Sequence, residues 1–322
     1  MKRAFLVLIC AILLCMTFLY GCGGDETNVK IGRQQFDINS TRVLLDGCSL
    51  SQNTLKKLQS LTGLEDLELY ECEIPDLSLL AGLPGLKRLT IDECKISDLS
   101  SLTAVSALEE LTLDECEVSD LSPLTELKNL KSLSICKMPD ADIRHIAEMV
   151  NLESLTLYRM RLDDPPMLAA LTGLKSLNLG MCGNVKDLTF IQGLTRLEGL
   201  QLYNTDITDL SPLKKMENLK YLNICDTEVK DISPLSALTS LESLDMTAMV
   251  VDGIEPLSDL TNLKRLEFNA ESAKNGDLSP LHELKNLEKL VIIGLDFDQK
   301  EIWALEEAIP GLVIELPSTE GV

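Results

Sequence analysis

Leucine recurs at a spacing of about 22 residues through most of the chain. Apolar residues follow each leading leucine three and five positions later, and this alternation predicts a strand with one buried face. In the first unit, Leu67 and Leu69 are therefore expected in the core, with Asp66 and Glu68 on the surface. The leading leucines are Leu64, Leu86, Leu108, Leu130, Leu152, Leu174, Leu197, Leu219, Leu241, Leu263 and Leu287.

The second half of each unit carries apolar residues at a spacing of three. In the first unit, Ile74 is followed by Leu77, Leu80 and Leu83, which suits a short 3₁₀ or α turn behind the strand. One unit cannot bury all of these side chains alone, so neighbouring units must stack. The pattern predicts a curved solenoid with strands on one side and short turns on the other.

An aspartate stands immediately before the predicted turn in successive units, at Asp76, Asp98, Asp120, Asp142 and Asp164. Serine commonly follows two residues later, and in some units proline follows it. Aspartate accepts hydrogen bonds from the free amides at a helix start, and proline is tolerated in the first turn. We interpret these aspartates as helix caps and not as catalytic carboxylates.

The unit LEELTLDECEVSDLSPLTELKN resembles the leucine-rich repeat, and the resemblance extends from Val43 to Glu315. The segment D-L-S-P-L, at Asp120 to Leu124 and Asp209 to Leu213, is similar to the repeats of internalins and phosphatase regulators. The resemblance implies an α/β leucine-rich-repeat solenoid, with a parallel β-ribbon on the concave face and short 3₁₀ or α turns on the convex face.

The N-terminus has the layout of a secretory signal. Lys2 and Arg3 precede an uncharged apolar run, Ala4 to Leu19. The following Tyr20-Gly21-Cys22 resembles the end of a bacterial lipobox, although Tyr20 is larger than the usual residue. The resemblance implies removal of residues 1–21, lipid attachment at Cys22, and an extracytoplasmic protein that contacts the bacterial membrane through its lipid anchor only. An uncleaved anchor helix and ordinary secretion remain alternatives.

The remaining chain divides at changes in periodicity. Residues 22–40 are polar and lack a clear period, so they are expected to form a flexible tether. Residues 41–63 are an expected N-terminal cap, 64–297 the repeats, and 298–322 a C-terminal cap and tail. In the last segment, a helix is expected over Gln299 to Ala308, with Trp303 packed against the last coil.

Ten cysteines are present, of which Cys10 and Cys15 belong to the predicted signal. Five occupy the inward N/C position of the repeat, and we expect them to form a ladder of buried, reduced thiols: Cys48, Cys72, Cys94, Cys116 and Cys182. Cys136 and Cys225 come at the strand ends and are the more exposed candidates. A zinc site is not predicted, because no C-x-x-C pair occurs.

The net charge of −22 disfavours nucleic acid and anionic lipid surfaces as partners. The only histidines are His145 and His282, and the sequence has no nucleophile elbow and no glycine-rich phosphate loop. We therefore expect a non-enzymatic protein that uses no cofactor and no metal. A protein or peptide ligand with basic groups is the expected partner.

The outward positions of the predicted strands change character along the chain. The first three units carry mostly acids, whereas later units carry polar residues and tyrosine, a residue enriched in interfaces. The candidate partner-binding residues are Asp66, Glu68, Tyr70, Glu71, Asp92, Glu93, Asp114, Glu115, Tyr158, Arg159, Tyr203 and Tyr221. Two alternatives remain open: the acids only keep the protein soluble, or the solenoid is a structural spacer without a specific ligand.

Overall fold

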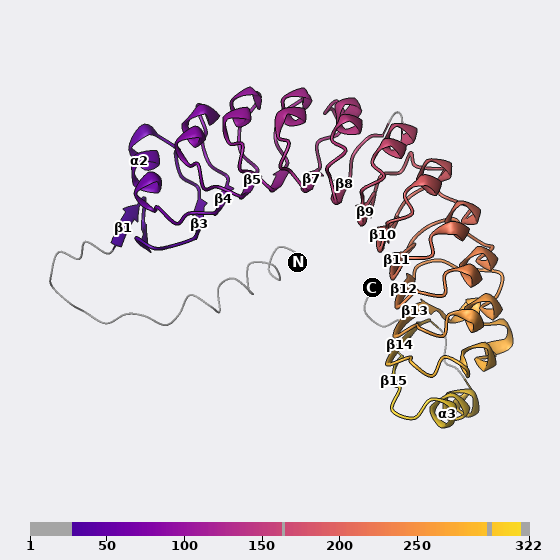
Figure 1. The fold of residues 1–322 in the computed structure, drawn as a ribbon. Helices are drawn as coiled ribbons and strands as arrows, with labels where there is room; N and C mark the ends of the chain where they lie inside the picture. The colour runs from indigo at the N-terminus through magenta and orange to yellow at the C-terminus, as the bar shows by residue number, and fades with distance from the viewer. Residues whose placement is uncertain (1–27, 163–164, 295–297, 317–322) are drawn as a thin grey trace, which may run out of the picture.

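The computed structural model describes residues 28–162, 165–294 and 298–316. The predicted signal peptide, Cys22 and Asp164 lie outside these ranges. The described chain forms an arc of stacked coils, with strands along the inner side and short helices along the outer side (Figure 1). Within these ranges, no helix is long and apolar enough to cross a bilayer.

One parallel sheet of 13 strands runs the length of the arc, in the order β15 to β3. Its register places equivalent repeat positions side by side, such as Leu67 opposite Leu89, so the predicted solenoid with its parallel ribbon is confirmed. The strands are β3 (Arg42–Asp46), β4 (Asp66–Tyr70), β5 (Arg88–Asp92), β6 (Glu110–Asp114), β7 (Ser132–Cys136), β8 (Ser154–Tyr158), β9 (Ser176–Asn178), β10 (Gly199–Gln201), β11 (Tyr221–Asn223), β12 (Ser243–Met246), β13 (Arg265–Asn269), β14 (Lys289–Ile293) and β15 (Val313–Glu315).

Short 3₁₀ helices cover the outer side of the ribbon, as the spacing of three predicted. Leu77 and Leu80 of the first of them are buried, together with Leu67 and Leu69 of the strand. The 3₁₀ helices are η1 (Leu77–Gly82), η2 (Ser100–Ala104), η3 (Ser122–Glu126), η4 (Ile143–Glu148), η5 (Pro165–Ala170), η6 (Thr189–Gly193), η7 (Ser211–Lys215), η8 (Ser233–Ala237), η9 (Glu255–Asp259), η10 (Ala270–Ser272), η11 (Lys274–Gly276) and η12 (Ser279–Leu281).

The aspartates before these helices act as caps. Oδ1 of Asp76 accepts the backbone N–H of Ser78 at 2.8 Å, and Asp98 accepts that of Ser100 at the same distance. Hydrogen bonds from the Ser78 hydroxyl and amide hold the pKa of Asp76 below its usual range. The capping interpretation is confirmed for these residues, since a carboxylate fixed in this way is a poor proton acceptor.

The N-terminal end differs from the expected tether. Residues 28–37 form an antiparallel hairpin that packs on the first coil, and Ile31 of this hairpin is 2% exposed. Leu55 and Leu58 are also buried there, as expected for the cap. The hairpin escaped prediction because its apolar residues are few and do not share the repeat spacing. Its strands are β1 (Asn28–Ile31) and β2 (Gln34–Asp37), and the cap helix is α2 (Gln52–Ser60).

At the other end, the helix α3 (Gln299–Ala308) has the predicted bounds. The prediction for Trp303 is wrong, because this side chain is 61% exposed. Ile302, Leu305 and Ile309 share one side of the helix at spacings of three and four, and they are the residues that enter the core. Trp303 is one residue out of that phase and faces away from it.

Candidate interaction surface on the concave face

The concave face consists of the outward strand side chains and the residue that follows each strand. At its N-terminal end, the acids of β4 are already neutralised. Arg42 donates from Nε to Glu68 Oε1 at 2.6 Å, and Arg88 Nε lies 3.2 Å from Asp66 Oδ2. The Tyr70 hydroxyl donates to Glu68 Oε2 at 3.1 Å, which leaves Glu68 only 7% exposed. Asp66 and Glu68 are therefore less available to a partner than their sequence positions indicated.

The next two strands carry a partly buried carboxylate pair, Asp92 and Asp114, held side by side by the register of β5 and β6. Within the described ranges, the buried Oδ1 of Asp92 has no hydrogen-bond donor. Burial, together with the charge of Asp114, raises the pKa of Asp92 to about 6. Burial also raises the pKa of Asp114, although its Oδ1 lies 3.3 Å from Lys137 Nζ. The pair is thus a desolvated concentration of negative charge.

Glu71, Glu93 and Glu115 form an acidic column along the edge of this pair. Their φ angles are 49°, 50° and 49°, in the left-handed region. The conformation lets the backbone N–H of Glu71 donate to Asp92 O at 2.9 Å, and the same bond recurs one repeat later. Glycine, asparagine or aspartate suits this region, whereas other residues lose roughly 1 kcal/mol or more. Glutamate is therefore not explained by the backbone.

The left-handed position continues through six more repeats, where its occupants are Lys137, Arg159, Met181, Asn204, Asp226 and Ala248. The turn itself is thus a property of the stacked coils and tolerates many side chains. The sequence does not reveal this turn, because only Asn204 and Asp226 are residues that favour such a backbone.

Two of the three candidate tyrosines of the middle region come together. The ring centroids of Tyr158 and Tyr203 are 6.3 Å apart, with the rings tilted by 38°. Gly180 occupies the equivalent position in the repeat between them, and a Cβ added there would lie 2.4 Å from the Tyr203 ring. Tyr221 stands in a different column and is 54% exposed, so it is not part of this tyrosine pair.

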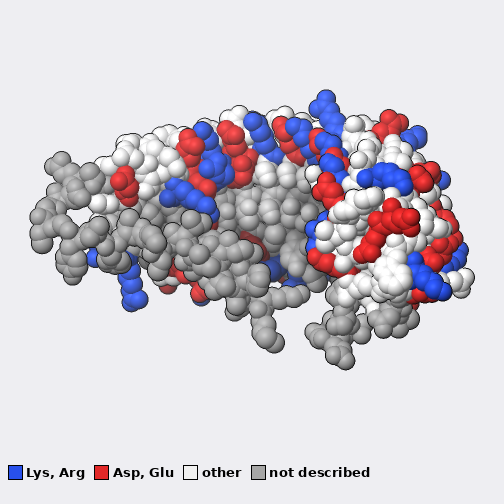
Figure 2. Space-filling model, turned by 90° about the horizontal axis from the view of Figure 1, so that it is seen from below, with Lys and Arg blue, Asp and Glu red and all other residues white. Residues whose placement is uncertain are grey.

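A charge ladder that was not predicted from the sequence runs beside the concave face. Glutamate and lysine alternate strictly at the second position of the repeats, and Figure 2 shows acidic and basic side chains alternating along the upper edge of the molecule. Lys87 Nζ lies 2.8 Å from Glu65, and Lys175 Nζ lies 2.7 Å from Glu153. The ladder comprises Glu65, Lys87, Glu109, Lys131, Glu153, Lys175, Glu198, Lys220, Glu242, Lys264 and Glu288.

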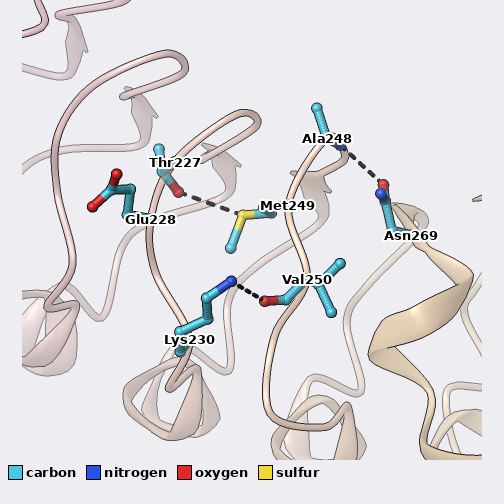
Figure 3. Close-up of a pocket in the computed structure, with 7 residues that line it drawn as sticks. All are labelled: Thr227, Glu228, Lys230, Ala248, Met249, Val250 and Asn269. Atoms are coloured by element: carbon cyan, nitrogen blue, oxygen red, sulfur yellow. Dashed lines mark hydrogen bonds between the residues drawn. The ribbon is translucent and has the colours of Figure 1, made fainter.

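A cavity of about 500 Å³ opens farther along the solenoid, beside the irregular segment that follows β13 (Figure 3). Several of its polar groups are engaged with one another. Lys230 Nζ donates to the Val250 carbonyl at 2.9 Å, and the Ala248 amide donates to Asn269 Oδ1 at 2.9 Å. The cavity offers no convergent catalytic groups. In the described part of the chain, no group of three or more His, Cys, Asp or Glu residues is placed to hold a metal ion.

The stacked coils, the 3₁₀ helices and the aspartate caps can be compared with known proteins. A family model for leucine-rich repeats, in two copies, matches residues 195–235. An internalin (InlF) from Listeria monocytogenes has a similar structure, with a TM-score of 0.65, 25% sequence identity and 90% of each chain covered. The fold is a leucine-rich-repeat solenoid.

More distant solenoids share this fold. The functional domain of InlJ from Listeria monocytogenes, which includes a cysteine ladder, has a TM-score of 0.60 and 17% identity over 89% of this chain and 66% of its own. The ectodomain of the receptor kinase GASSHO1/SCHENGEN3 from Arabidopsis thaliana, solved with Casparian strip integrity factor 2, has a TM-score of 0.51 and 17% identity, covering 87% of this chain and 41% of its own. No curated protein sequence matches the chain.

Proposed function

We propose that this solenoid is a surface-exposed, non-enzymatic scaffold whose concave face binds a protein or peptide with basic groups. The acidic column is the observation that carries the proposal. Glu71, Glu93 and Glu115 place like charges on adjacent coils, and these charges repel one another. This repulsion, repeated at one position in three consecutive repeats, is accounted for if the carboxylates bind a cationic partner.

Lys137 indicates how such a partner would be held. Its Nζ lies 2.8 Å from Glu115 and 3.3 Å from Asp114, so one ammonium group bridges the acidic column and the carboxylate pair. A lysine or arginine of the partner would make the equivalent bridge one repeat earlier, between Glu93 and Asp92. Binding there would lower the raised pKa of Asp92 and offset its desolvation.

The tyrosine pair supplies the second element of the proposed surface. Tyr158 and Tyr203 lie beyond Lys137 along the same face, with Arg159 in the adjacent column. Aromatic side chains with a polar tip bury apolar area while their hydroxyls stay hydrogen-bonded. We therefore propose that a bound segment runs along the ribbon, with its basic groups toward β4 to β6 and an apolar group at the tyrosine pair.

The location of the scaffold is a separate proposal. The sequence before the described residues supports export, cleavage after Gly21 and lipid attachment at Cys22. Palmitate labelling of the wild-type chain and of a Cys22→Ala variant tests this. Label that persists undiminished in the variant would contradict the lipid anchor but would leave the binding proposal untouched.

Charge reversal tests the binding surface. The triple variant Glu71→Lys, Glu93→Lys and Glu115→Lys is compared with a matched control that reverses three exposed glutamates on the convex side, Glu126, Glu217 and Glu283. Binding of fluorescent peptides of equal length but rising lysine and arginine content is measured by anisotropy at physiological ionic strength. We expect the concave variant to lose at least about tenfold in affinity, with the control close to wild type.

Two other outcomes of this experiment would favour the alternative functions. An equal loss in both variants would mean that only net charge matters, which favours the solubilising role of the acids. Absence of binding by any basic peptide to the wild-type chain would favour the spacer alternative, in which the solenoid holds other parts of a cell envelope apart without a specific ligand.

A further inference from the structure

The thiols of the cysteine ladder follow one hydrogen-bonding rule. The thiols on the inner coils donate to a carbonyl of the preceding coil: Cys94 to Leu69 at 3.5 Å, and Cys182 to Leu157 at 3.0 Å. Cys116 behaves in the same way. Burial raises the pKa of Cys182 to about 11, and these thiols are neutral and turned toward backbone. They are shielded from reagents, because each is at most 7% exposed.

Cys48 cannot follow this rule, because β3 is the first strand of the sheet and, among residues 28–316 as described, no preceding coil of the ribbon offers a carbonyl. Its Sγ instead lies 3.3 Å from Sγ of Cys72. Backbone pairing fixes the two residues as neighbours, since the Glu73 amide donates to the Cys48 carbonyl at 2.9 Å. Cys48 is also only half-buried, whereas Cys72 is 2% exposed.

We propose that Cys48 and Cys72 are a site of reversible disulfide formation that fastens the N-terminal cap to the first repeat. The oxidant is a small-molecule disulfide such as oxidised glutathione. The Cys48 thiolate attacks it, forming a mixed disulfide and releasing one thiol. Cys72 then attacks Sγ of Cys48, which expels the second thiol. Two protein thiols and one external disulfide thus become one protein disulfide and two external thiols.

The geometry favours this pair over the next one, Cys72 and Cys94. Adjacent parallel strands lie about 4.8 Å apart, within the range of Cα separations that a disulfide spans. Closing the bond requires the two sulfur atoms to approach from 3.3 Å to about 2 Å and forfeits the long contact of Cys72 Sγ with Leu45 O, at 3.6 Å. The side chains of Cys72 and Cys94 also interact, but Cys94 Sγ is held by the main chain: it accepts the Cys72 backbone N–H at 3.2 Å and donates to Leu69 O at 3.5 Å.

The Cys48–Cys72 bond would lie at the N-terminal end of the solenoid, where it would oppose local unfolding. Ends of repeat arrays open first, because a terminal coil has only one neighbour. A bond between Cys48 and Cys72 would enclose α2 in a covalent loop and hold the first coil closed. This refines the expectation that all five ladder thiols stay reduced: Cys94, Cys116 and Cys182 do, and the pair at the open end is oxidisable.

The test uses the purified full chain, first reduced and then incubated with oxidised glutathione, followed by alkylation of free thiols and peptide mass mapping. We expect a Cys48 to Cys72 cross-link, with Cys94, Cys116 and Cys182 alkylated only after unfolding. Burial raises the pKa of Cys48, so the rate should rise with pH. Oxidation should also slow proteolysis of the N-terminal cap several-fold, and dithiothreitol should reverse this.

Two variants distinguish formation of the mixed disulfide at Cys48 from the subsequent attack by Cys72. Cys72→Ser should trap glutathione on Cys48, because the attacking second thiol is missing, whereas Cys94→Ser should cross-link like the wild type. The proposal is overturned if the wild-type chain accumulates only the glutathione adduct, if Cys72 pairs with Cys94, or if the cross-link forms only in denaturant.

Discussion

Nζ of Lys137 lies 2.8 Å from Oε1 of Glu115, so the acidic column ends in a cation that the chain itself supplies. Hydrogen bonding to Glu115 raises the pKa of Lys137 above its ordinary value, which keeps the ammonium group charged at any physiological pH. The internal cation marks the boundary between the acidic repeats and the tyrosine pair.

Replacement of this lysine should separate stability from binding. Lys137→Met removes two ion pairs from Asp114 and Glu115 and should lower the free energy of unfolding by about 1 kcal/mol. The freed carboxylates should bind lysine-rich peptides several-fold more tightly, because an internal competitor is gone. Urea unfolding and peptide anisotropy measure the two effects, and weaker peptide binding by the variant would contradict the assignment of this surface.

Asp92 should make stability depend on pH. Its folded pKa of about 6 exceeds the ordinary value, so its stabilising contribution is complete below pH 4 and is lost as pH rises through 6. Asp92→Asn should therefore be more stable than wild type by about 1 kcal/mol at pH 8, after allowance for solvent screening, and nearly equal near pH 4. Urea titrations at both pH values check this. A gain of equal size at both would exclude ionisation as the cause.

The same variant should bind basic peptides less well at pH 8, despite its greater stability. A gain in stability with a loss of affinity is expected where a carboxylate lies in a destabilising environment and binds a partner there. Unchanged affinity would place the partner elsewhere on the ribbon.

Gly180 should control the tyrosine pair. In Gly180→Ala the new methyl group would stand 2.4 Å from the Tyr203 ring, which must swing away and separate from Tyr158. We expect loss of the ring-to-ring nuclear Overhauser effect in tyrosine-labelled protein and a destabilisation of about 1 kcal/mol. Gly193→Ala is the matched control, because no atom lies within 4 Å of its added Cβ. An intact ring contact in Gly180→Ala would refute the role of this glycine.

Exchanging the two residues of an isolated ion pair should leave stability unchanged, but the same exchange within the charge ladder should lower it. Swapping Glu153 with Lys175 preserves their own pairing but creates like-charge neighbours at Lys131 and Glu198, whose charges already act on them. The swapped variant should melt about 2 °C lower than wild type, and the difference should shrink in high salt. Full recovery of the melting temperature would show that the pairs act independently.

Most of the fold could be predicted from the sequence, because the same weak pattern of apolar residues recurs in every repeat. One alternating stretch such as Leu67 and Leu69 predicts little, but its recurrence in eleven units determines the strand, the core positions and the capping aspartates. Trp303 shows how the same reasoning fails once the repetition ends. The bounds of the helix that contains Trp303 were predicted correctly. Which side of that helix faces the core, however, is set by the positions of Ile302 and Leu305.

The candidate surface was less predictable, because its properties arise between coils. Glu68 has the pattern of an exposed acid, but Arg42 from the preceding coil covers it, 26 residues away in sequence. The left-handed backbone of Glu71 depends on a hydrogen bond to the next strand, which no local residue preference indicates. Tyr158 and Tyr203 meet only because the repeat between them lacks a side chain at Gly180.

Strict alternation of glutamate and lysine also constrains how this molecule can change in length. Deletion of a single repeat, such as residues 152–173, would bring Lys131 beside Lys175 and leave every later coil out of phase with the earlier ones. Deletion or duplication of two repeats restores the alternation. Shortened or lengthened forms of this ribbon, whether found among its relatives or constructed, are therefore expected to differ by even numbers of repeats.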